Sequence, residues 1–207
     1  MRYTSILAAI LLIAGCKTNM NIKISESDLA GEPKEIPALL DVEVPGCSQP
    51  EDSRKESEAL EKVKKMIPEM FGNTEFKECY TKGFESFAQF QIPVSIMSNG
   101  KLAGDNVGVY RKEGVVMGFY VPKSVARNLA ILEKENMLEM TFGVIVDYKN
   151  NGNENITAEA SGVYIDDKPY VIGEVAIKKT ATIQIRSSNL LSDYLRENQS
   201  WAVLKTK

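Results

Sequence analysis

Cys16 is the residue whose type and surroundings point most directly to a covalent reaction. The chain begins with Met-Arg-Tyr-Thr, continues with an apolar run over residues 6–14, and places Gly15 directly before Cys16. One positive charge, a short apolar core and a small residue are the parts of a secretory signal. We therefore expect residues 1–15 to be a signal peptide and Cys16 to be a site of lipid attachment.

The segment Leu12-Ile13-Ala14-Gly15-Cys16 resembles the lipobox of bacterial lipoproteins, with Ile13 where Leu is commonest. The resemblance implies a diacylglyceryl group on the Cys16 sulfur, cleavage before Cys16, and a further acyl chain on the new amino terminus. Two or more acyl chains hold a protein stably on a membrane, and the apolar run is about half the roughly 20 residues of a membrane-spanning helix. The alternatives are an ordinary cleaved signal with a coincidental cysteine and an uncleaved amino-terminal anchor.

Lys17, the residue after the cysteine, bears on sorting. In enterobacterial lipoproteins an Asp at this position usually signals retention in the inner membrane. Because Lys17 is not Asp, we expect a lipid-anchored protein of the cell envelope that faces the periplasm, in the outer rather than the inner membrane. No second apolar stretch approaches membrane length, so the rest of the chain is expected to be water-soluble.

The composition argues against most enzyme chemistry. The chain has no histidine, which excludes Ser-His-Asp and Cys-His arrangements and histidine-containing zinc sites. An enzyme would need a carboxylate pair, a Ser-Lys pair or a Tyr, and no motif marks one. We expect no catalytic residue, no metal and no cofactor. With a net charge of −3 and no long basic run, nucleic acid is not an expected partner.

Cys47 and Cys79 are the two cysteines that follow Cys16. Exported proteins fold in an oxidising compartment, where such a pair forms a disulfide by default. The chain-entropy argument gives about 3–4 kcal/mol for a loop of this length. The alternatives are two buried free thiols or an intermolecular bridge.

Three aspartates could in principle bind calcium. Asp166 and Asp167 are adjacent and Asp147 precedes them, but the Asp-x-Asp-x-Asp-Gly spacing of a calcium loop is absent. We therefore interpret Asp166-Asp167 as a hairpin turn with solvated carboxylates.

Aromatic residues recur after the second cysteine, at Tyr80, Phe84, Phe87 and Phe90. They could line a ligand groove, but side chains of the core between the disulfide and a sheet are the favoured interpretation.

Alternating apolar and polar residues predict many strands, the longest over residues 138–148. Pro93 places the strand over residues 90–96 at a sheet edge or a bulge.

Ser48 and Glu51 have the spacing of a capping box, so we expect a helix from about residue 50, with Gly72 closing it. Further strands are expected over residues 40–44, 107–110, 115–121, 156–165, 170–177 and 180–186, with helices over 124–134 and 190–195.

Short turns between consecutive strands indicate a largely antiparallel sheet. Helices separated from the strand runs indicate an α+β fold with two or three helices packed on one face. We expect a signal peptide over residues 1–15, the lipidated cysteine and a tether over residues 16–35, and one globular domain over residues 36–207.

An ordered set of short motifs resembles a group of uncharacterised lipoproteins encoded by enterobacterial prophages and plasmids. The motifs are Ser27-Asp28-Leu29, Val42-Glu43-Val44-Pro45-Gly46-Cys47, Cys79, Gly83-Phe84-Glu85-Ser86-Phe87, Gln91-Ile92-Pro93, Ser161-Gly162-Val163 and Pro169. The resemblance implies a shared topology and disulfide but no activity. We expect a non-enzymatic lipoprotein that contacts the membrane through acyl chains on Cys16 and binds an envelope protein, with phage exclusion or envelope modulation as possible roles. The alternative is an envelope hydrolase or an inhibitor of one.

Overall fold

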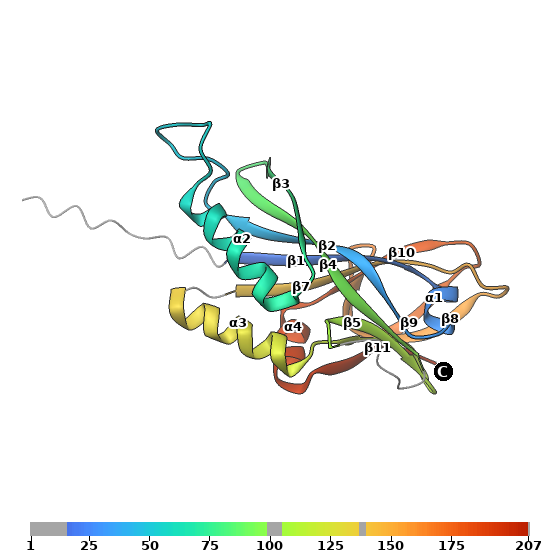
Figure 1. Cartoon of the computed structure of the whole chain (residues 1–207). Coiled ribbons are helices and arrows are strands. Elements are labelled where there is room, and N and C mark those ends of the chain that lie inside the picture. Colours follow the sequence, from blue (N-terminus) through green and yellow to red (C-terminus); the bar gives the residue numbers. More distant parts are fainter. Residues whose placement is uncertain (1–15, 99–104, 137–139, 207) are drawn as a thin grey trace, which may run out of the picture.

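The computed structural model describes residues 16–98, 105–136 and 140–206, and the expected signal peptide over residues 1–15 lies outside them. The described residues form eleven strands and four helices (Figure 1). The strands are β1 (Cys16–Ser25), β2 (Lys34–Val44), β3 (Glu75–Lys82), β4 (Glu85–Ser98), β5 (Gly108–Lys112), β6 (Val115–Tyr120), β7 (Met140–Lys149), β8 (Ile156–Ile165), β9 (Lys168–Ile177), β10 (Thr182–Ser187) and β11 (Ser200–Thr206). The helices are α1 (Glu26–Ala30), α2 (Glu58–Phe71), α3 (Lys123–Asn136) and α4 (Asn189–Asn198). Within the described ranges, no helix is long and apolar enough to cross a membrane.

All eleven strands belong to one sheet, and nine of them close into a barrel. The order around the ring is β10-β7-β1-β2-β4-β5-β6-β11-β8, and β8 returns to β10 through the pairs Ile165–Ile185 and Val163–Ser187. Strands β3 and β9 lie outside the ring, where β3 pairs with β4 and β9 with β8. Most pairs are antiparallel, but β1–β7 and β4–β5 are parallel.

The expected α+β fold is therefore wrong, since the chain is mostly strand and its sheet closes on itself. Alternating hydrophobicity suits both an open sheet covered by helices and a sheet that curls around its own core. The helices also do not share one face. Figure 1 shows α1 at one end of the sheet and α2 and α3 towards the other. Helix α1 contacts β1, β4 and β5, whereas α4 contacts β7, β8 and β11.

The amino-terminal segment is the second correction. Residues 16–35, expected as a tether, form β1, α1 and the beginning of β2. Strand β1 lies between β2 and β7 in the ring, and its side chains Met20, Ile22 and Ile24 are buried in the core. These three residues fix β1 in place, because its apolar face would otherwise be exposed to water. Strand β1 is therefore part of the folded domain.

The helix expected from about residue 50 begins at Glu58 instead. Its cap is Ser57, whose hydroxyl accepts the main-chain N–H of Leu60 at 3.1 Å, so the capping box expected at Ser48 and Glu51 is not formed. The physical reason is packing. Helix α2 buries Leu60, Ile67 and Phe71, whereas residues 51–56 are all polar and offer nothing to the core.

Pro93 lies where β4 lacks a second neighbour. Strand β3 pairs with β4 as far as Gln91, and β5 joins β4 only from Ser95 onward. Proline has no N–H to donate to a ladder, so a local edge of this kind suits it. The strand itself is not at an edge, because β4 lies between β2 and β5 in the ring, but Pro93 lies at a local gap on one side of it.

Candidate functional site

Cys16, the expected lipid-attachment residue, is the first residue of β1 and lies in register with Met140 of β7. The next residue, Lys17, is bonded to two carboxylates. The main-chain N–H of Lys17 donates to the Glu43 carboxylate at 3.0 Å, and its ammonium is bonded to Glu85. The Glu85 carboxylate raises the pKa of Lys17. The position of Cys16 is thus fixed by the sheet where β2 ends and β4 begins.

The expected disulfide between Cys47 and Cys79 is present, with the two Cα atoms 5.6 Å apart. Cys47 follows β2, and Cys79 lies in β3, outside the ring. The bridge therefore joins the segment before α2 to a strand that has one neighbour, β4, among the described strands.

The aromatic cluster noted in the sequence divides among three environments. Phe90 is buried in the core, where its ring meets Phe76 edge-on at 5.4 Å. Tyr80 and Phe87 lie opposite each other on neighbouring strands and stack at 5.7 Å. Phe84 lies in the β3–β4 turn and is fully exposed. The core interpretation is right for Phe90 and Phe87, which are both buried, and the four rings do not form one groove.

A network of polar side chains lies beside the Tyr80–Phe87 stack. The Asp41 carboxylate accepts hydrogen bonds from the amides of Asn21 and Gln89, each at 2.9 Å. The same carboxylate acts on Tyr80, because burial together with the Asp41 charge raises the pKa of Tyr80 to about 12. The network joins β1, β2, β3 and β4, so spacing along the sequence could not indicate it.

The three aspartates considered for calcium have protein partners instead. Asp147 accepts a hydrogen bond from the Gln184 amide at 3.1 Å, and Asp166 accepts the Gln184 main-chain N–H at 2.9 Å. Asp167 forms an ion pair with Arg186 at 3.4 Å. Asp166 and Asp167 have positive φ values of 47° and 64°, which suits a two-residue hairpin turn. Among the residues that the structure describes, no cluster of metal-ligating side chains was found.

A cavity of about 300 Å³ opens beside Pro93, where β2, β4 and the start of β3 line it. Two carboxylates line it, and each has a partner. Glu35 accepts a hydrogen bond from Asn106 at 2.6 Å, and Glu75 forms an ion pair with Lys77 at 2.7 Å. The hydroxyl of Thr74, which also lines the cavity, is buried without a hydrogen-bond partner in the described part of the chain. A catalytic activity that uses carboxylates would be placed in this cavity.

The chain's single tryptophan is half-buried, and three neighbours contact its ring. The Trp201 indole N–H donates to the Ser161 hydroxyl at 3.1 Å. The ring of Tyr194 meets the indole edge-on with centroids 5.0 Å apart, and the Lys205 ammonium lies 5.8 Å from the indole centre. The indole is therefore oriented by defined contacts before any ligand arrives.

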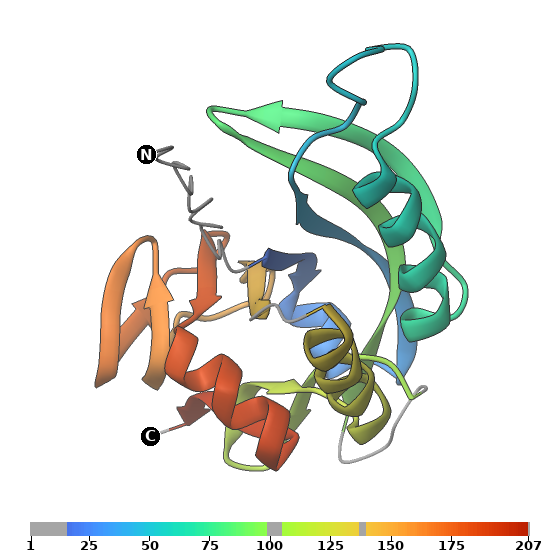
Figure 2. The same cartoon turned by 90° about the vertical axis from the view of Figure 1, so that its left-hand side faces the viewer.

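Exposed apolar side chains continue this surface in two directions. On α4, Leu190 is 81% exposed and precedes Tyr194 by one helical turn. On β9, Ile172 is 72% exposed and lies opposite Ser161 on β8. We call these four residues, Ile172, Leu190, Tyr194 and Trp201, the α4–β9 patch. Figure 2 shows α4 next to β8 and β9.

Sequence reasoning missed this patch because it placed Leu190, Leu191, Tyr194 and Leu195 on one helical face. In the structure Leu191 and Leu195 are buried, whereas Leu190 and Tyr194 are exposed. Two apolar pairs at i, i+4 spacing can occupy two different stripes of a helix. The i, i+4 spacing within each pair was the sequence signal that could have indicated an exposed apolar stripe on this helix.

Together these features define a small closed-sheet protein with a fixed aromatic patch and an expected lipidation site at its first strand. A family model described as "Domain of unknown function (DUF7424)" matches residues 18–207, and the chain belongs to this family. The match begins within β1, in agreement with a domain that includes this strand. Comparisons with curated proteins and with solved structures found no match.

Proposed function

We propose that the protein is a cell-envelope lipoprotein, anchored by acyl chains on Cys16, that acts by binding another envelope protein through the α4–β9 patch. The position of Cys16 supports the anchor. Because Cys16 is already part of β1, acyl chains on this residue hold the barrel directly against the membrane. The anchored protein faces the periplasm, and Lys17 favours the outer membrane.

The observation that carries the binding role is the exposure of Leu190, Tyr194 and Ile172 beside the half-buried Trp201, whose ring has a fixed orientation. Aromatic side chains dominate the binding energy of protein interfaces, and they do so best when their orientation is set in advance. The indole N–H is already bonded to Ser161, so a partner that covers the ring leaves no donor without an acceptor.

The edge of β9 adds a second means of contact. Among the described strands β9 pairs only with β8, so one side of its backbone is available for pairing with another chain. Both Val171 and Ile172 are exposed on this strand. An envelope protein that presents apolar side chains and a strand is the partner that fits. Phage exclusion or alteration of a receptor is the role that accords with the prophage resemblance.

The anchor is tested by palmitate labelling of cells. The wild-type chain should be labelled and processed, and Cys16→Ser should be neither. Equal labelling of the two proteins would refute lipidation at Cys16. Separation of the membranes on a density gradient tests sorting, and recovery with inner-membrane markers would contradict the expected outer-membrane location.

The binding role is tested by gentle crosslinking of intact membranes followed by purification of the tagged chain. Leu190→Asp and Ile172→Asp should each weaken binding to the partner by roughly 2 kcal/mol, about thirty-fold in affinity. The amount of crosslinked complex should fall accordingly. Ile131→Asp is the matched control, because Ile131 is an exposed apolar residue of α3 outside the patch. A complex that survives both patch variants as well as it survives the control would refute this surface.

The second candidate is an envelope hydrolase, and the cavity lined by Glu35 and Glu75 is the observation that favours it. Turnover of cell-wall material by the purified protein, abolished by Glu35→Gln or Glu75→Gln but not by Leu190→Asp, would establish this candidate over the binding role.

A further inference from the structure

Phe84 is the most exposed large apolar side chain of the described residues. It follows Gly83, whose φ of +65° allows the tight β3–β4 turn between Lys82 and Glu85. A positive φ at the first turn position favours glycine, but nothing in the turn geometry requires phenylalanine at the second. Behind the turn, the stacked rings of Tyr80 and Phe87 brace the two strands.

A single exposed apolar residue is ordinary on a protein surface, so the argument depends on where Phe84 lies. Its neighbour Glu85 is bonded to the ammonium of Lys17, and Lys17 follows Cys16 directly. The turn is therefore joined, through the Lys17 side chain, to the start of the strand whose first residue is expected to bear the acyl chains. Figure 1 shows the β3–β4 turn and the start of β1 towards the same end of the molecule.

The charges around the turn permit close approach to a membrane. Glu85 is the acidic residue next to Phe84, and its ion pair with Lys17 offsets its charge. Lys82, on the other side of the turn, is exposed, and a lysine at this position is attracted to anionic headgroups. Aromatic rings are favoured where apolar acyl chains meet the headgroups.

We propose that the β3–β4 turn inserts Phe84 into the lipid surface to which Cys16 is anchored. The inference rests on the lipid anchor of the proposed function and adds a second, non-covalent membrane contact. The acyl chains on Cys16 and the inserted Phe84 together fix the orientation of the barrel on the membrane, whereas an anchor at one residue leaves the barrel free to rotate. The α4–β9 patch is then held at a constant height above the lipid.

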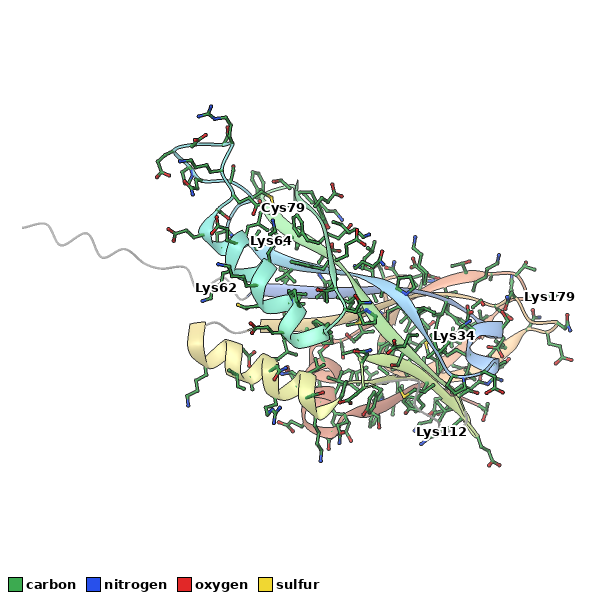
Figure 3. All side chains as sticks on the ribbon, viewed as in Figure 1. Lys34, Lys62, Lys64, Cys79, Lys112 and Lys179 are labelled. Carbon is green, nitrogen blue, oxygen red and sulfur yellow. A yellow bond between two sulfur atoms is a disulfide. The ribbon has the colours of Figure 1, made fainter. Side chains whose placement is uncertain are left out.

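The test uses the full chain purified from membranes and reconstituted into vesicles of phosphatidylcholine and phosphatidylglycerol with brominated acyl chains. Phe84→Trp places a second tryptophan in the turn, and the wild-type chain, with Trp201 alone, gives the baseline. Lys179→Trp is the matched control, since Lys179 is exposed and lies at the opposite end from Cys79 in Figure 3. Co-flotation with the vesicles reports the anchor independently of the fluorescence.

The turn tryptophan should lose most of its added emission to the brominated lipid and should shift to shorter wavelength. The Lys179→Trp emission should be as bright as in vesicles without bromine. Co-flotation with no quenching of the turn tryptophan beyond the control would overturn the membrane contact and leave the anchor intact. Failure of the chain to co-float would overturn the anchor and the turn contact together.

Discussion

The indole N–H of Trp201 is bonded at 3.1 Å to the hydroxyl of Ser161, a residue forty positions earlier in the chain. This bond connects β11 to β8 and sets the plane of the ring that Tyr194 meets on its edge. The same serine lies opposite Ile172. One hydroxyl thus links the helix side and the strand side of the α4–β9 patch.

We predict that Ser161→Ala lowers stability by about 1 kcal/mol, the usual net value of one such hydrogen bond, and loosens the indole. Because the chain has one tryptophan, its fluorescence anisotropy reports the ring directly and should fall. Tyr194→Phe is the control, since it keeps the ring contact without the hydroxyl. Unchanged anisotropy in Ser161→Ala would show that packing alone orients Trp201.

The disulfide gives the second prediction. Cys47→Ser, Cys79→Ser and the double variant should each lose roughly 2–5 kcal/mol, and they should be alike because each removes the same bond. Limited proteolysis should cut first in the polar segment over residues 48–57, which precedes α2 and would lose its link to β3. Earlier cleavage in β7 or β8 would show that the bridge stabilises the whole barrel rather than this segment.

Much of the strand content could be predicted from alternation, because residues of β4, β7 and β8 that face the core recur at every second position. Strand β3 was not predicted from the sequence because it contains a bulge. The pairing with β4 shifts between Phe76 and Glu78, so the apolar side chains on this strand do not alternate regularly. An extra residue in one strand changes which side chains share a face.

Closure of the sheet could not be predicted for a different reason. It depends on β10 pairing with both β7 and β8 and on β1 entering between β2 and β7. These are contacts between distant segments, and alternation within one strand says nothing about its neighbours. The disulfide was predictable because two cysteines in a chain expected to be exported leave few choices, whereas the patch joins residues of α4, β9 and β11 that no local pattern groups.

Tyr80 gives the pH prediction. Its folded pKa of about 12 lies above the ordinary value of 10, so the folded state keeps the phenolic proton where the unfolded state loses it. The resulting stability is fully present below pH 10 and is lost as the pH rises towards 12. Tyr80→Phe should therefore show a shallower loss of stability across this window, measured by urea unfolding. In Asp41→Asn, which removes the charge that opposes ionisation, phenolate absorbance should appear at lower pH. Identical pH slopes for wild type and Tyr80→Phe would contradict the assignment.

The last prediction concerns Glu26, the first residue of α1, whose carboxylate is bonded to the guanidinium of Arg111 and the hydroxyl of Tyr148. Tyr148 is buried in the barrel, and burial followed by the Glu26 contact raises the pKa of Tyr148. Removing the cation leaves a largely buried carboxylate without its counter-charge, which costs more than removing both partners.

Arg111→Met should accordingly lower the free energy of unfolding by roughly 2–4 kcal/mol. The double variant Arg111→Met, Glu26→Gln should recover part of that loss, because the neutral amide can still accept the Tyr148 hydrogen bond. Urea unfolding of the wild type, both single variants and the double variant completes the cycle. Losses that simply add would mean that Arg111 and Glu26 act independently, and α1 would then be held at its end of the barrel by the burial of Leu29 rather than by this ion pair.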